Sequence, residues 1–225
     1  MGEIMNTVLY VALGFLDIVV VFAFLFKIYR WPFWGYAREI AAIALTLSII
    51  SWVDRVVFQW ADWDATVQYG LVILSLKLLF RVRWNRAFTL ATVGYLAFVS
   101  TQNVVYALLL VTNMVNMADA QITQGAGTYL IQICTHLVSL LICLALYYGG
   151  YGFSYISVPP HDRKKELASN VQRVISALNV LAALILASTM YWVMNYYQHV
   201  YIIVPSALLA LFLLIVVSRK RESAQ

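Results

Sequence analysis

A few ionisable residues interrupt the long apolar segments of this chain, and they are the first candidates for chemistry. Asp17 lies in the apolar run 15–20, and His136 lies in the run 130–143. Burying an ionisable group in such a segment is costly, so each one requires a partner, a proton or a ligand. For Asp17 the alternatives are a ligand, ion or proton contact, or a hydrogen bond between helices. For His136 they are a proton switch, a metal ligand or a catalytic base, or a neutral imidazole bonded to a neighbouring helix.

Three amides and one cation complete the set of candidates. Gln102 and Asn103 lie in one apolar segment, Gln132 lies in another, and Arg55 is the only cation outside four basic clusters. These side chains could line a ligand cavity if they face inward. Alternatively, the amides could join helices, and Arg55 could pair with a nearby carboxylate such as Asp62. We predict all six candidates, Asp17 and His136 included, to be ligand contacts.

Neither a metal site nor catalysis is expected. No His or Cys pair has the spacing of metal ligands, and a metal site would need more ligands of matching type, so we expect neither metal nor cofactor. The interval from His136 to Cys143 resembles the motif of the AgrB family of membrane cysteine peptidases. However, a continuous helix separates these two residues by about 10.5 Å along its axis. A base must come within hydrogen-bond reach of its nucleophile, so we do not expect an enzyme.

The basic residues define the elements that must position these side chains. Apart from Arg55, every Lys and Arg falls within 27–38, 77–86, 163–173 or 219–221. Positive charge is retained on the cytoplasmic side of a membrane. A helix needs about 20 apolar residues to cross the hydrocarbon core, and each gap between clusters has room for an outward and a returning helix. The pattern therefore predicts an all-α bundle of seven transmembrane helices, with the N-terminus outside and the C-terminus cytoplasmic.

We expect the whole chain, 1–225, to form a single transmembrane domain of a multi-pass cell-membrane protein. The predicted spans are 5–26, 39–59, 66–80, 87–111, 129–148, 174–197 and 200–217. An outer turn is expected at 60–64. The longest outer loop, 112–127, is polar and has room for a short helix. In this topology the six candidates lie in the outer half, apart from Asp17 near the middle, whereas Asn179 lies in the inner half.

Composition supports a membrane protein. The chain is 63% hydrophobic and 11% charged, against about 25% charged for soluble domains. Its formal net charge of +5 is explained by membrane orientation, because the cations lie where that orientation requires them, and no nucleic-acid partner is expected. The lipid bilayer is the partner that the sequence implies most directly.

The arrangement of turns resembles the membrane sensor regions of Gram-positive peptide-sensing histidine kinases of the AgrC type. The features that carry this resemblance are the turn Arg30-Trp31-Pro32 after the first span, a short third span ending in the basic turn 81–84, and a basic exit from the last span. The resemblance implies a sensor of an extracellular ligand. Such sensors continue into a cytoplasmic kinase, whereas this sequence ends at Gln225, so we expect the signal to pass to a cytoplasmic or membrane partner.

Three functions follow from these residues. The leading hypothesis is a non-enzymatic sensor or receptor that binds an extracellular ligand through the six candidates. The second is a small transporter or transporter subunit, with Asp17 as the coupling carboxylate. The third is a structural membrane subunit whose polar groups hold helices together.

Overall fold

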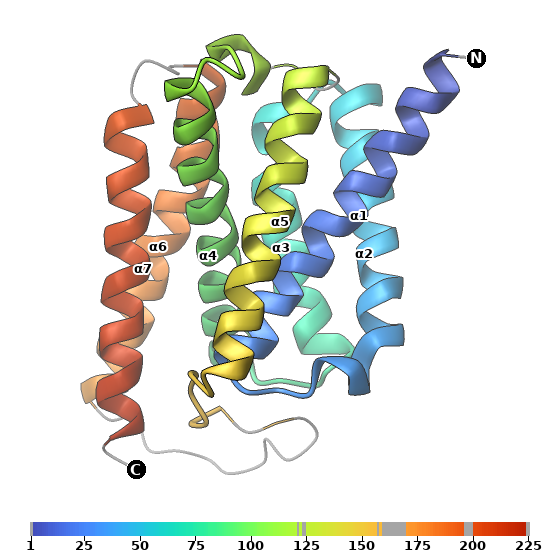
Figure 1. The fold of residues 1–225 in the computed structure, drawn as a ribbon. Helices are drawn as coiled ribbons and strands as arrows, with labels where there is room; N and C mark the ends of the chain where they lie inside the picture. Colours follow the sequence, from blue (N-terminus) through green and yellow to red (C-terminus); the bar gives the residue numbers. More distant parts are fainter. Residues whose placement is uncertain are drawn as a thin grey trace.

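The computed structural model describes residues 2–120, 122, 125–156, 158, 170–195 and 200–223, and every regular element in these residues is helical (Figure 1). The α-helices are α1 (Gly2–Ile28), α2 (Ala37–Trp52), α3 (Ala61–Leu78), α4 (Trp84–Val111), α5 (Ala126–Tyr148), α6 (Asn170–Asn195) and α7 (Val200–Glu222). Two 3-10 helices, η1 (Phe33–Tyr36) and η3 (Met117–Ala120), and one π-helix, η2 (Val53–Val57), complete the described elements. The expected all-α class is confirmed, with seven α-helices in the described residues.

Four helical stretches in the described residues are long and apolar enough to cross a membrane. They are Ile4–Ile28, Phe33–Val57, Trp84–Val111 and Ala126–Tyr148. α3 is more polar, because it carries Asp62, Asp64 and Lys77. The chain is therefore a helical protein with several candidate membrane spans, as its composition predicts.

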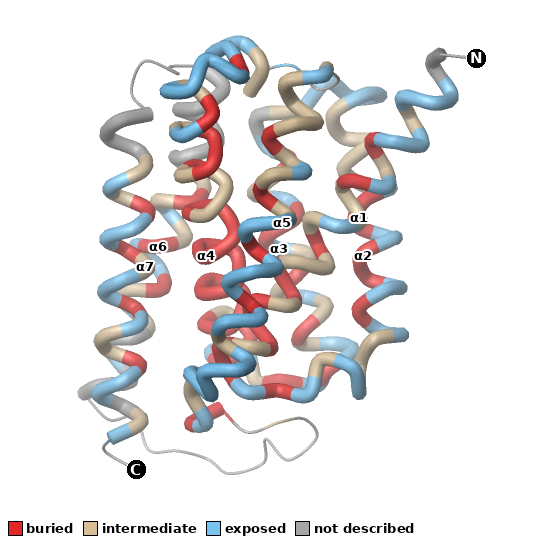
Figure 2. Tube along the Cα trace, in the orientation of Figure 1, coloured by how far each residue is buried: buried red, intermediate tan, exposed pale blue. Residues whose placement is uncertain are grey.

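α4 is the central helix of the bundle. It packs against α1, α3, α5, α6 and α7, and its first half is almost continuously buried (Figure 2). Small residues allow the close approach that this position requires. At Gly94, an added Cβ would lie 3.1 Å from the Leu25 Cβ and 3.2 Å from the carbonyl oxygen of Val21. α1 therefore crosses α4 at backbone contact, a distance that small residues permit between membrane helices.

Two loops differ from, or refine, the sequence-based expectation. The prediction of an outer turn at 60–64 is wrong, since α3 already begins at Ala61. Asp62 and Asp64 lie in the first helical turn of α3, a position where the helix dipole favours negative charge. Acidic residues that suggest a loop in the sequence therefore mark the beginning of a helix. The short helix allowed for in the loop 112–127 is present as η3.

The loop after α5 is anchored to the end of α1. The indole Nε1 of Trp31 donates to the carbonyl oxygen of Ile156 at 3.1 Å, and Arg30 Nη2 donates to that of Gly150 at 2.7 Å. The Tyr155 hydroxyl lies 3.3 Å from that of Tyr29. These contacts join segments far apart in the sequence at the end of the bundle opposite the N-terminus (Figure 1).

The end of α7 is attached to the same loop through Glu222. Its carboxylate accepts hydrogen bonds from the amide and hydroxyl of Ser154 and from the amide of Tyr155. Partial burial alone would raise the pKa of Glu222. The hydrogen bonds and the nearby positive charge of Arg30 outweigh burial, so the pKa lies below its ordinary value.

Candidate functional site

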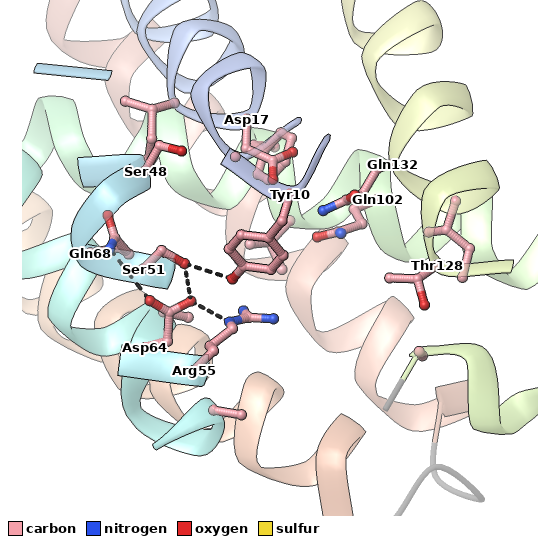
Figure 3. A pocket seen from close by; sticks show the side chains of 18 of the residues that line it. Tyr10, Asp17, Ser48, Ser51, Arg55, Asp64, Gln68, Gln102, Thr128 and Gln132 are labelled. Atoms are coloured by element: carbon pink, nitrogen blue, oxygen red, sulfur yellow. Dashed lines mark hydrogen bonds and ion pairs between the residues drawn. The ribbon is translucent and has the colours of Figure 1, made fainter. Parts of the chain in front are cut away.

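A polar cavity lies in the half of the bundle nearest the N-terminus. Its walls come from the first half of α1, the end of α2 with η2, the start of α3, the second half of α4, η3, and the start of α5. The cavity volume is about 150 Å³, comparable with an engineered protein cavity that binds benzene. Figure 3 shows polar side chains from several helices around this space.

Arg55 and Asp64 form an ion pair on one wall of the cavity. Arg55 Nε donates to Asp64 Oδ2 at 2.6 Å. The same oxygen accepts a hydrogen bond from Ser51 Oγ at 3.0 Å, and Asp64 Oδ1 accepts from Gln68 Nε2 at 3.4 Å. Tyr10 lies 3.1 Å from Ser51, and since the Ser51 proton is directed at Asp64, Tyr10 is the donor there. These contacts stabilise the Asp64 carboxylate and link α1, α2, η2 and α3 (Figure 3).

A π-turn positions Arg55 for this pair. The amide of Phe58 bonds to the carbonyl oxygen of Val53 at 3.0 Å, a five-residue spacing that accommodates one residue more than an α-helical turn. Such single turns occur frequently at functional sites. Because each residue of an α-helix turns the chain by about 100°, the altered turn determines which way Arg55 points. The sequence suggests Asp62 as a partner of Arg55, but the side chain of Asp62 lies outside the part of the chain that the structure describes. The partner of Arg55 in the structure is Asp64.

Asp17 and His136 form a second polar pair. His136 Nε2 lies 2.7 Å from Asp17 Oδ1, joining α5 to α1. Asp17 lines the cavity, whereas His136 is not one of the residues that line it. The Asp17 side chain is 23% exposed and that of His136 is 12% exposed. A carboxylate–imidazole pair in this position can hold or transfer a proton, and it can also present the carboxylate to a ligand.

The three predicted amides also meet at the cavity. Gln102 and Asn103 reach it from α4, and Gln132 reaches it from α5. Within the described part of the chain, none of these amides has a hydrogen-bond partner, and the buried Nδ2 of Asn103 is left unsatisfied. The structure therefore brings all six candidates together, five in the cavity wall and His136 bonded to one of the five. Asn179, outside this site, donates to Thr89 Oγ1 at 2.7 Å.

Four polar residues around Arg55 were not predicted from the sequence as parts of the site: Tyr10, Ser51, Asp64 and Gln68. Asp64 and Gln68 are four residues apart, and this spacing places them on one helix face. That signal was missed because 60–64 was interpreted as a turn. Tyr10 and Ser51 carry no charge, and an apolar segment gives no indication of which of its hydroxyls faces a cavity.

The donor set suits ligand binding better than metal coordination. In the described ranges, no group of three or more His, Cys, Asp or Glu residues could hold a metal ion. The cavity instead offers a guanidinium, three carboxylates and several neutral amides, which are groups that recognise polar organic molecules. Comparisons of the chain with protein-family models, with curated proteins and with solved structures found no match.

Proposed function

We propose that this protein is a seven-span membrane protein with its N-terminus outside and its C-terminus in the cytoplasm. The four apolar helical stretches support this topology. The chain order places the basic turns 27–38 and 77–86 and the end of α7 at the bundle end opposite the N-terminus (Figure 1). Cations clustered at one end are the pattern of a cytoplasmic face. The cavity then lies in the outer half.

We further propose that the protein is a sensor that binds a small polar ligand from outside the cell in this cavity. The observation that carries the proposal is the convergence of the six residues. Asp17, Arg55, Gln102, Asn103 and Gln132 all line one cavity, and His136 is bonded to Asp17. These residues come from α1, η2, α4 and α5. If each of them served only to join two helices, they would have no reason to meet at one cavity.

A ligand screen tests this proposal. The purified full chain in mild detergent is heated with a library of small polar compounds, and the unfolding temperature is measured. A ligand that binds only the native state raises this temperature with concentration. Gln132→Phe should abolish the increase by filling the cavity. Ile133→Phe is the matched control, because the neighbouring Ile133 is exposed on the surface of α5. An effect unchanged by Gln132→Phe would locate binding elsewhere and refute the proposal.

The signal is proposed to pass to a cytoplasmic or membrane partner, as the likeness to AgrC-type sensor regions implies. The contacts of Trp31 and Glu222 with the loop after α5 support this step, since they join α1 and α7 at the end opposite the cavity. Affinity purification in mild detergent, with mass spectrometry of bound proteins, tests it. A co-purifying kinase whose activity changes with ligand supports signalling, whereas a transport ATPase would contradict it.

A proton-coupled transporter is the second candidate, and the Asp17–His136 pair favours it. Carboxylate and histidine pairs within membrane helices are typical of proton relays. In proteoliposomes, a transporter should accumulate its substrate when a proton gradient is imposed, and Asp17→Asn should abolish accumulation. Binding without accumulation would leave the sensor proposal as the one supported.

A further inference from the structure

The cavity is lined by one arginine, Arg55, and by three carboxylates, Asp17, Asp64 and Asp119. Arg55 and Asp17 are each backed by a more buried partner. The Arg55 side chain is 26% exposed, whereas its partner Asp64 is 4% exposed. The Asp17 side chain is 23% exposed, and its partner His136 is 12% exposed. Both Arg55 and Asp17 line the cavity, so an occupant meets a guanidinium on one wall and a carboxylate on another (Figure 3).

We propose that the ligand is a small zwitterion of the amino-acid class, with its carboxylate at Arg55 and its ammonium group at Asp17. This inference rests on the proposed ligand-binding function and specifies the chemical class of the ligand. The two charged walls discriminate between ligands by repulsion as well as by attraction. A purely cationic ligand would face Arg55, and a purely anionic one would face Asp17, whereas a zwitterion complements both.

The free atoms of both groups suit these roles. Arg55 uses Nε for Asp64, and its two terminal nitrogens have no hydrogen-bond partner in the described part of the chain. A planar guanidinium edge can bind a carboxylate through two parallel hydrogen bonds. Asp17 uses Oδ1 for His136, and Oδ2 has no hydrogen-bond partner among the described residues. This oxygen can accept a hydrogen bond from an ammonium group.

The amides and the size of the cavity narrow the class further. Gln102 and Gln132 also line the cavity, and both can donate and accept hydrogen bonds. The volume of about 150 Å³ matches a molecule of about the size of benzene, which is also the size of glycine or alanine. A peptide is too large to be enclosed, although a single residue of one could enter.

A comparison of matched probes tests the inference on the native chain alone. Alanine, ethylamine and propionate are similar in size and differ in charge, and their binding to the detergent-purified full chain is measured by calorimetry at neutral pH. Each charged hydrogen bond that a probe cannot make should weaken binding by about tenfold or more. Alanine is therefore expected to bind at least about tenfold more tightly than either singly charged probe. Equal or weaker binding of alanine overturns the inference.

Two variants then assign the ends of the ligand. Arg55→Gln should weaken alanine binding by about tenfold or more, whereas ethylamine should bind no less tightly, because the repulsion from Arg55 is removed. Asp17→Asn should weaken alanine binding to a similar extent, whereas propionate should bind no less tightly, because the repulsion from Asp17 is removed. Arg38→Gln, an exposed arginine at the start of α2, is the matched control and should change nothing. If ethylamine or propionate binds best and Gln132→Phe abolishes that binding, the zwitterion class is wrong but the ligand-binding function stands. If neither these probes nor the library binds in the cavity, both proposals fall.

Discussion

The Arg55–Asp64 pair should behave as one energetic unit, and removing either charge alone should be more damaging than removing both. Asp64 is 4% exposed and is held by Ser51 and Gln68, so it cannot leave the cavity wall when Arg55 is removed. Two unit charges about 4 Å apart attract by about 4 kcal/mol at an effective dielectric constant of about 20. Since a quarter of Arg55 is exposed, we expect Asp64→Asn or Arg55→Gln to cost about 3 kcal/mol each.

The double variant should cost only about 2 kcal/mol, because no uncompensated charge remains. This leaves a coupling free energy of about 4 kcal/mol between the two positions. The assay is unfolding of the detergent-purified chain by increasing SDS fraction, followed by the fluorescence of the tryptophans, of which Trp60 and Trp63 closely precede Asp64 in sequence. Arg38→Gln, far from the cavity, should cost less than about 0.5 kcal/mol. Single costs that add to within about 0.5 kcal/mol in the double variant would refute the reasoning.

Three further predictions concern the rest of the bundle. Gly94→Ala should destabilise the protein by about 1–3 kcal/mol in the same unfolding assay, because the added methyl meets α1 backbone, and a neutral result would contradict the close helix crossing. Asn179→Ala and Thr89→Ala should each cost about 0.6–1.7 kcal/mol and should not add in the double variant, since they remove one buried hydrogen bond; full additivity would show that the bond contributes nothing. Glu222 has a lowered pKa, so its stabilising contribution is complete above the unfolded-state pKa and is lost as pH falls through the folded-state pKa. Thermal unfolding from about pH 7 to about pH 3 should therefore show a smaller acid-induced loss in Glu222→Gln than in the native chain or in the exposed control Glu39→Gln, and equal losses would refute it.

The positions of the helices could be predicted from the sequence, because the basic clusters and the lengths of the apolar segments between them follow directly from the order of residues along the chain. Glu39 to Gln59 was predicted as one span, and α2 with η2 occupies nearly that range. The π-turn within it was not predictable, because no residue type distinguishes a π-turn from an α-helical one. Its effect on Arg55 therefore appears only in three dimensions.

The candidate site was predictable as a set of residues but not as pairs. Asp17 and Arg55 could be selected because charge in an apolar segment requires an explanation. Their partners could not be assigned, since His136 is distant from Asp17 in sequence and helix packing determines which faces meet. Asp64 was missed for a local reason, because acidic and aromatic residues at 60–64 suit a turn as well as the first turn of a helix.

α1 is one unbroken helix from the cavity to the opposite end of the bundle, so a tilt of α1 at the cavity displaces its other end. Asp17 and Ile28, the last residue of α1, are separated by about 16.5 Å along the helix axis. A tilt of about 5° about Asp17 would therefore move the far end by about 1.4 Å. Hydrogen bonds such as those from Arg30 and Trp31 to the loop after α5 do not survive such a displacement. That loop must then follow α1 or release it, and either response would carry a small change at the partly buried Asp17 to the end of α7, which Glu222 attaches to the same loop.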